Sequence, residues 1–223
     1  MDFAKFVSLL DNSSLYFSRS DVLGDPFEGT LPNRTIQTVK TRFTEGGIAH
    51  EIERMFNFTM EAKLTTFINC WSIGQHESAA MWKLYVKNDY GIAIESTFSQ
   101  LRKVLINTSC SIYTGKVRYI DYENDEIEFG DMFQPFLIKR ASYAHENEIR
   151  NLIWVNEATN KSIFTQPFSK GFNIKIELAN LINSVHISPD SQEWFKDLVK
   201  SLLIKNNLNV NIYKSSLNDM PKI

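Results

Sequence analysis

The stretch NCWSIGQHESAAMWKLYVKNDYGIAIE, from Asn69 to Glu95, decides how the rest of the chain is interpreted. Its first residues end an alternating pattern that predicts a strand over 66–72. A short helix is predicted over 77–87 and a second strand over 91–95. Apolar anchors and polar groups are mixed densely along this strand–helix–strand unit, so we expect part of a site here.

The regions on either side of this unit predict a mixed set of helices and strands. The upstream segments are a helix over 2–10, a strand over 15–18 and helical residues over 34–64, broken at Gly46-Gly47. The downstream segments are a helix over 132–144, a strand over 152–155, a loop over 156–170 and a terminal β-α-β unit over 184–213. The pattern predicts an α+β fold, a mixed β-sheet with flanking helices, formed as a single domain over residues 1–223.

The sequence YAHENEIR, residues 143–150, places acidic side chains next to an arginine. If the strand begins near Glu146, then Glu146, Glu148 and Arg150 share one face by the two-residue period. Such a face is either a surface ion-pair ladder or the edge of an active site. In the second case the two carboxylates raise the pKa of one of them, as a general acid requires.

The sequence LGDPFEG, residues 23–29, has the composition of a tight turn. Pro26 favours the first corner of a type I turn, and the side chain of Asp25 can accept a hydrogen bond from the backbone two residues on. The turn is either purely structural, or it projects Asp25 and Glu28 into a cleft. The sequence leaves both interpretations open.

Composition limits the classes of function. The 223 residues are 43% hydrophobic and 22% charged, with a formal net charge of −2. This charge gives no general attraction to nucleic acid or to an anionic membrane. No apolar run reaches the length of a membrane span, and the first residues lack the pattern of a signal peptide. We therefore expect a cytoplasmic protein without membrane or nucleic-acid partners.

The two cysteines predict neither a disulfide framework nor a metal site. Cys70 and Cys110 are 40 residues apart, and the four histidines are scattered along the chain. Cys70 lies among apolar neighbours, so we expect a buried structural thiol. No glycine-rich phosphate loop and no zinc-protease motif is present. The sequence predicts no metal ligands.

Four blocks of the sequence resemble one family. They are LYFSRSDVLGDPFEG at 15–29, the CWS, ESAAMWKLY and GIAIE segments within 70–95, YAHENEIR at 143–150 and VHISPDSQEWFKDLVKSLL at 185–203. Together they resemble the prokaryotic domain of unknown function 2971. The resemblance implies a cytoplasmic bacterial α+β domain, often found in defence-related contexts. The chain departs from the family in opening at its first helix rather than at a short strand, and in carrying His145 beside the glutamates.

The layout is also similar to ADP-ribosyltransferases, which place an early polar residue, a middle aromatic and a late glutamate around NAD. Tyr85 or Tyr143 and Glu148 match the later two roles, and the early residue would lie on the strand that precedes the first helix in the family. The likeness makes NAD the candidate cofactor, although no cofactor follows from the residues themselves.

These observations define a candidate cleft and a hypothesis for its use. The expected catalytic residues are Glu148 and Glu146, and the expected binding residues are Asp25, Glu28, Trp71, Ser72, Trp82, Tyr85, Tyr143 and Arg150. Glu148 would act as acid–base or stabilise a developing sugar cation, and Arg150 would hold an anionic part of a small-molecule or nucleotide ligand. The alternative is a non-catalytic module whose aromatic face binds a partner protein. The oligomeric state is left open.

Overall fold

The fold of the chain is α+β, as the sequence predicts. The computed structural model describes residues 1–86, 89–128, 130–155 and 170–221. These residues form two compact units, each built from separate stretches of the chain. The first unit comprises Met1–Tyr16, Gly74–Cys110 and Asn173–Ile223, and the second comprises Phe17–Ile73 and Ser111–Phe172. The single domain over 1–223 stays a prediction, and each unit is described by itself.

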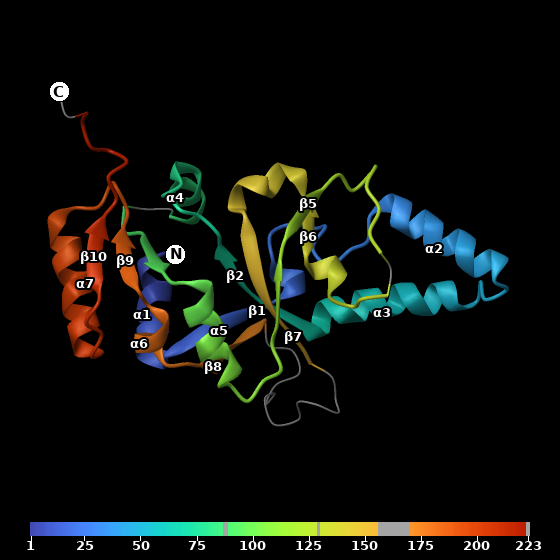
Figure 1. Ribbon diagram of the computed structural model, residues 1–223, viewed down its shortest axis with the longest axis horizontal. Coiled ribbons are helices and arrows are strands. Elements are labelled where there is room, and N and C mark those ends of the chain that lie inside the picture. Colours follow the sequence, from blue (N-terminus) through green and yellow to red (C-terminus); the bar gives the residue numbers. More distant parts are fainter. Residues whose placement is uncertain (87–88, 129, 156–169, 222–223) are drawn as a thin grey trace. The chain divides into compact units, whose positions relative to one another are not determined.

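A five-stranded sheet with the order β4-β7-β2-β1-β8 forms the framework of the second unit (Figure 1). Its strands are β1 Ser14–Arg19, β2 Thr66–Ser72, β4 Tyr113–Lys116, β7 Glu148–Trp154 and β8 Gly171–Lys175. The boundary between the units falls within β1 and β8. β2 pairs antiparallel with β7 over its whole length, and β7 pairs antiparallel with β4. The strand predicted over 66–72 is confirmed with the same bounds.

Two helices precede β2, as the sequence predicts. α2 covers Asn33–Glu45 and α3 covers Glu51–Thr65, and α3 continues directly into β2 (Figure 1). The break lies at the predicted pair of glycines, where Gly47 has a φ of 70° that residues with a side chain rarely adopt. Ala62 of α3 packs in one core cluster with Ile68 of β2 and Leu152 of β7. Apolar contact therefore fixes the end of α3 against the sheet.

The helix predicted over 132–144 is wrong. Gln134–Phe136 form a short 3-10 helix, Ile138–Arg140 form strand β6, and Ala141–Glu146 form a second 3-10 helix. β6 pairs in parallel with β5, Arg118–Ile120, so tertiary hydrogen bonds replace those that a helix would make within itself. Ile138 joins a second core cluster, with Leu31, Ile120, Tyr122 and Ile127. Burial in that cluster outweighs the local helical spacing.

The first unit contains a three-stranded sheet with the order β10-β9-β3. β9, Ser184–Ile187, and β10, Asn211–Lys214, run parallel and are joined by α7, Glu193–Lys205. This confirms the predicted terminal β-α-β unit. β3, Ile92–Glu95, completes the sheet as an antiparallel edge.

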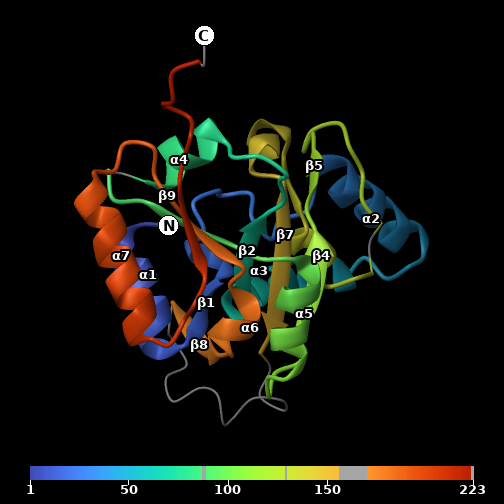
Figure 2. The ribbon, with the colours of Figure 1, turned by 60° about the vertical axis from the view of Figure 1, so that its left-hand side comes forward.

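Helices surround the sheet of the first unit. They are α1 Phe3–Asn12, α4 Ala79–Tyr85, α5 Phe98–Ile106 and α6 Leu178–Leu181, besides α7. Figure 2 shows α1 beside α7, and their contact includes the rings of Phe3 and Phe195, whose centroids are 5.2 Å apart. Among the described residues, no helix combines the length and the apolar character needed to cross a membrane. The loop predicted over 156–170 lies almost wholly outside the described residues.

Candidate functional site

Five charged side chains form a buried ion network in the second unit. The ion network consists of Glu28, Lys139, Glu146, Glu148 and Arg150, none of them more than 8% exposed. Buried charges at this density are costly unless each is paired, because the interior solvates ions poorly. The chain supplies the pairing from four places, namely the turn at 25–29, strand β6, the 3-10 helix Ala141–Glu146 and the start of β7.

Arg150 is the centre of the ion network and is completely buried. Its Nη1 and Nη2 donate to the two carboxylate oxygens of Glu28, at 2.7 Å each. Its Nε donates to Glu148 at 2.8 Å, Nη1 also donates to the carbonyl of Phe136 at 2.8 Å, and Nη2 reaches Glu148 at 3.4 Å. All N–H donors of the guanidinium are thereby used. Arg150 therefore orients the two glutamates, and the geometry gives no support to the ligand-binding role that the sequence suggested.

Lys139 joins the two predicted catalytic glutamates. Its Nζ donates to Glu148 at 2.8 Å and also hydrogen-bonds to Glu146, and it lies 3.5 Å from Glu28. Glu146 is not on the strand with Glu148 as expected, because β7 begins at Glu148 and Asn147 before it has a left-handed φ of 41°. The lysine, rather than strand alternation, brings the two carboxyl groups together.

The surroundings move the pKa values of the two glutamates in opposite directions. Burial and a hydrogen bond with Glu148 raise the pKa of Glu146 above its ordinary value, against the pull of Lys139. Burial alone would also raise the pKa of Glu148, but hydrogen bonds with Glu146 and Arg150 lower it well below its usual range. Glu146 is therefore the member of the pair that holds a proton most readily, and Glu148 is the one that stays ionised.

A third cationic group, Arg140, lies beside the ion network at the surface. Arg140 binds the buried Asp25 through Nη2 at 2.8 Å and Nε at 3.3 Å, and its side chain is 35% exposed. Its guanidinium carbon lies 4.6 Å from the ring centre of Phe27 and 5.4 Å from that of Tyr143. Asp25 also accepts a hydrogen bond from the backbone N–H of Phe27, which is the turn geometry expected from the sequence. Arg140 is thus fixed along one edge and reaches solvent along another.

The end of β2 borders the ion network on the same face of the sheet. Cys70 pairs with Arg150 and Ser72 pairs with Glu148, so their side chains share a face with those residues. Both are exposed, and the hydroxyl of Ser72 donates to the carbonyl of Glu146 at 2.8 Å. The expectation that Cys70 is a buried thiol is wrong. Dense protein around its sulfur, together with the Glu148 carboxylate, nevertheless raises the pKa of the thiol, so Cys70 is no activated nucleophile.

Trp71 lies on the opposite face of the sheet. Its indole N–H donates to Asn69 at 2.7 Å, and Asn69 also accepts from the buried Asn151 at 3.3 Å. Thr114 of β4 donates to Asn151 at 2.8 Å, which completes a row of polar side chains across three strands. Alternation along β2 thus separates Trp71 from Cys70 and Ser72.

Trp82 and Tyr85 belong to α4 in the first unit. Trp82 is buried, and its indole N–H donates to Glu77 at 3.0 Å. Tyr85 is 49% exposed. The second unit therefore brings together six of the ten predicted site residues, Asp25, Glu28, Tyr143, Glu146, Glu148 and Arg150, in or beside the ion network, with Ser72 at its border.

Sequence reasoning missed Lys139 and Arg140 as site residues. Both residues lie within 132–144, the range predicted as a helix. On such a helix Arg140 would fall in line with the apolar residues, and Lys139 would face solvent. The available signal was the isolated Ile138-Lys139-Arg140 triplet after a proline-containing turn. A strand of three residues gives too little alternation to be distinguished from helical spacing.

Comparison with known proteins assigns no family and no function to the site. No protein-family model matches the chain. No curated protein and no solved structure matches it either. Within the described part of the chain, no group of three or more histidine, cysteine or acidic residues is arranged to hold a metal ion.

Proposed function

We propose that the second unit is an enzyme domain in which Glu146 and Glu148 act on a nucleotide-type small molecule. One observation carries the proposal. Two buried carboxyl groups share the ammonium group of Lys139, and their surroundings move their pKa values apart. Opposite shifts in an adjacent pair are the pattern expected of an acid and an ionised partner at one site.

In this proposal the two glutamates have different tasks. Glu146 holds a proton and donates it to a leaving base such as adenine, which would otherwise depart as an anion. The nicotinamide of NAD departs as a neutral molecule and takes up no proton. Glu148 stays ionised and stabilises the positive charge that develops on a sugar carbon as its bond to the leaving base breaks. A water molecule then forms the new bond to that carbon and releases a proton, so the reaction is a hydrolysis. Lys139 and Arg150 touch the carboxylates rather than the ligand, so they are positioning residues. The exposed Ser72 and Cys70 mark the side from which a ligand approaches.

Arg140 supports a phosphate-bearing ligand. Asp25 fixes the guanidinium along its Nε and Nη2 edge, and no described residue hydrogen-bonds to Nη1. The rings of Phe27 and Tyr143 flank it, and such rings also stack on nucleobases. Guanidinium groups match phosphate oxygens in geometry and charge. We therefore assign to Arg140 the anion-binding task that the sequence suggested for Arg150.

The proposal is tested by the turnover of NAD and ATP, followed by chromatography of the products. Wild type should convert at least one of them, and Glu148→Gln should lower kcat for either by about 100-fold or more. Glu146→Gln should lower kcat by about 100-fold or more for the release of adenine from ATP, where the leaving base needs a proton. Arg140→Lys should raise KM with a smaller effect on kcat, because it removes a ligand contact. Glu126→Gln is the matched control, since Glu126 is exposed and lies outside the ion network.

Folding is checked for every variant by circular dichroism and thermal unfolding. If Glu148→Gln does not fold, the comparison is made between Glu146→Gln and Glu126→Gln. Equal turnover by wild type and both network variants contradicts the proposal. So does the absence of NAD and ATP conversion by a folded wild-type protein.

A further inference from the structure

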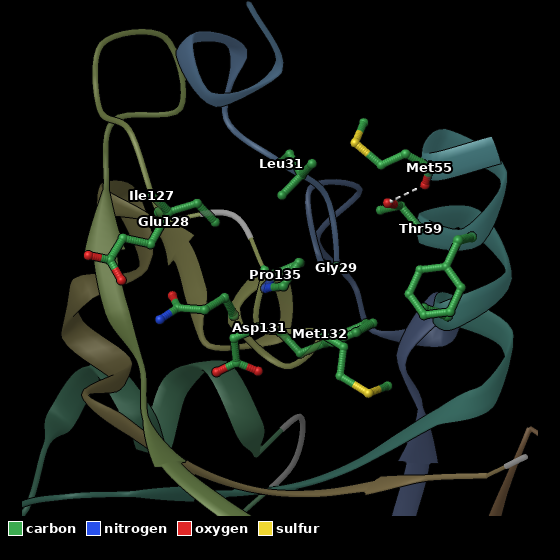
Figure 3. Close-up of a pocket in the computed structure, with 14 residues that line it drawn as sticks. Gly29, Leu31, Met55, Thr59, Ile127, Glu128, Asp131, Met132 and Pro135 are labelled. Atoms are coloured by element: carbon green, nitrogen blue, oxygen red, sulfur yellow. Dashed lines mark hydrogen bonds between the residues drawn. The ribbon is translucent and has the colours of Figure 1, made fainter. Parts of the chain in front are cut away.

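A pocket of about 200 Å³ opens in the second unit, apart from the glutamate pair. Figure 3 shows Met55 and Thr59 of α3 on one side of it, and Ile127, Glu128 and Asp131 on the other. Its lining is mainly apolar, and Phe58 of α3, which is 48% exposed, forms part of the rim. The pocket is thus an apolar hollow that reaches the surface.

The size of the pocket decides what it can hold. Sites for drug-sized ligands and cofactors usually enclose about 300–1,000 Å³. A volume of about 200 Å³ is too small for a nucleotide, and it is suited to one large apolar side chain. Methionines such as Met55 and Met132 adapt their shape to such an insert. Single buried anchors of this kind supply much of the affinity at protein interfaces.

The charge at the pocket decides what flanks that side chain. Glu128 and Asp131 are both exposed, and no cationic side chain of the described residues pairs with either. Among the described residues, the side chain of Asp131 accepts only the backbone N–H of Phe133, at 2.9 Å. Two uncompensated carboxylates beside an apolar hollow complement a lysine or arginine next to an apolar residue.

We propose that this pocket binds a basic peptide segment of a partner protein, with one apolar side chain inserted between α3 and the described segments 127–128 and 130–136. The inference does not depend on the proposed catalysis, because the pocket contains neither Glu146 nor Glu148. Its walls nevertheless include Gly29, next to Glu28, and Phe136, whose carbonyl accepts from Arg150. An occupied pocket therefore contacts two backbone segments that also hold the ion network.

The test uses three capped peptides with the sequences Gly-Lys-Phe-Lys-Gly, Gly-Glu-Phe-Glu-Gly and Gly-Lys-Ser-Lys-Gly. Binding is followed by amide chemical shifts of the isotope-labelled protein. The first peptide should shift signals of the pocket residues, and added salt should weaken it. The second lacks the positive charges and the third lacks the anchor, so neither should bind at the same concentration.

Variants then locate the binding site. Thr59→Trp fills the pocket from α3 and should abolish binding of the Lys-Phe-Lys peptide. Glu128→Gln combined with Asp131→Asn should weaken it by about fivefold, the effect of losing one or two exposed ion pairs. Asparagine at 131 keeps the turn contact to Phe133. Glu126→Gln removes a neighbouring exposed acid that does not line the pocket and should leave affinity unchanged.

Four results overturn the proposal. They are absence of binding by the Lys-Phe-Lys peptide, equal binding by the Glu-Phe-Glu peptide, equal weakening by Glu126→Gln, and full binding in a folded Thr59→Trp variant. Phenethylammonium is a further probe, and tighter binding of this ion than of the peptide would make a small molecule the occupant. Self-association in ultracentrifugation that Thr59→Trp removes would make a second copy the occupant.

Discussion

Arg150 and Glu28 are 122 residues apart in the chain, yet they are joined by two hydrogen bonds of 2.7 Å with both side chains buried. The pair connects the turn at 25–29 to strand β7. Taking two such charges out of water costs several kcal/mol per ion, and their attraction recovers that cost only when the geometry is good. The contact is therefore better evidence for a fixed arrangement than for added stability.

Removing both partners should cost less stability than the sum of the costs of removing each one. Glu28→Gln and Arg150→Met should each destabilise the protein by about 3–5 kcal/mol, because each leaves a buried charge without its partner. The double variant should be more stable than the sum of the two losses predicts, by at least about 2 kcal/mol. Urea unfolding of the four proteins measures this coupling.

The exposed pair on α3 is the control for this cycle. Arg54 contacts Glu51 at 2.9 Å, but the arginine side chain is 78% exposed. The cycle of Arg54→Met and Glu51→Gln should give a coupling below about 1 kcal/mol. If the two cycles give the same coupling, burial of the Arg150–Glu28 pair has no energetic consequence.

Glu146 and Glu148 should make the free energy of unfolding depend on pH in opposite directions. Because the folded-state pKa of Glu146 is raised, its contribution is complete below the unfolded value of about 4.3 and is lost as pH rises through the folded value. The folded-state pKa of Glu148 is lowered, so its contribution is lost only as pH falls into the acid range. Wild type should therefore lose stability relative to Glu146→Gln as pH rises above about 4.3 and passes through the raised folded-state pKa.

The measurement is the urea midpoint of both proteins at several pH values across that range. Glu126→Gln serves as the control and should follow wild type, because Glu126 is exposed and has no ion-pair partner among the described residues. A constant difference between Glu146→Gln and wild type at every pH would show that the carboxyl of Glu146 does not gain a proton on folding.

Local pattern was enough to predict the elements with strong periodicity. The strand over 66–72, the helix break at Gly46-Gly47 and the terminal β-α-β unit all follow from side-chain spacing or glycine conformation. Spacing also placed Glu148 and Arg150 on one strand face. These features depend on contacts between residues near each other in sequence, so the sequence carries them directly.

The rest depended on contacts between distant segments. Ile138–Arg140 form a strand only because β5 offers a partner, and this pairing turns Lys139 toward the glutamates. Asp25 and Glu28 were identified from turn chemistry, but their partners Arg140 and Arg150 lie 115 and 122 residues away. No spacing rule relates positions so far apart, which is why Arg140 was missed.

Gly29 should resist substitution for two separable reasons. Its φ is 67°, and a Cβ atom there would lie 2.5 Å from Cε1 of Phe136. Gly29→Ala should therefore cost about 1–3 kcal/mol in urea unfolding and disturb both the pocket wall and the neighbouring Glu28. Gly47→Ala has the same backbone strain in open space, and Gly24→Ala has neither strain nor a neighbour within 4 Å. The expected order of destabilisation, from largest to smallest, is Gly29, Gly47, Gly24. Equal losses at Gly29 and Gly47 would show that the contact with Phe136 adds nothing to the backbone strain, and equal losses at Gly47 and Gly24 would show that the positive φ costs nothing.

Cys70 should be exposed but slow to react. Its thiol pKa is raised by the dense protein around the sulfur and by the Glu148 carboxylate, so little thiolate forms near neutral pH. Iodoacetamide should label Cys70 more slowly than free N-acetylcysteine at about pH 8. Glu148→Gln removes one negative charge beside the thiol and should increase the rate severalfold, because it lowers the thiol pKa.

Burial raises the pKa of Cys110 without a contribution from Glu148, so Cys110 is the internal control in the same chain. Peptide mapping by mass spectrometry separates the two cysteines, and a Cys70 rate that matches N-acetylcysteine or does not respond to Glu148→Gln would contradict the electrostatic link between β2 and β7.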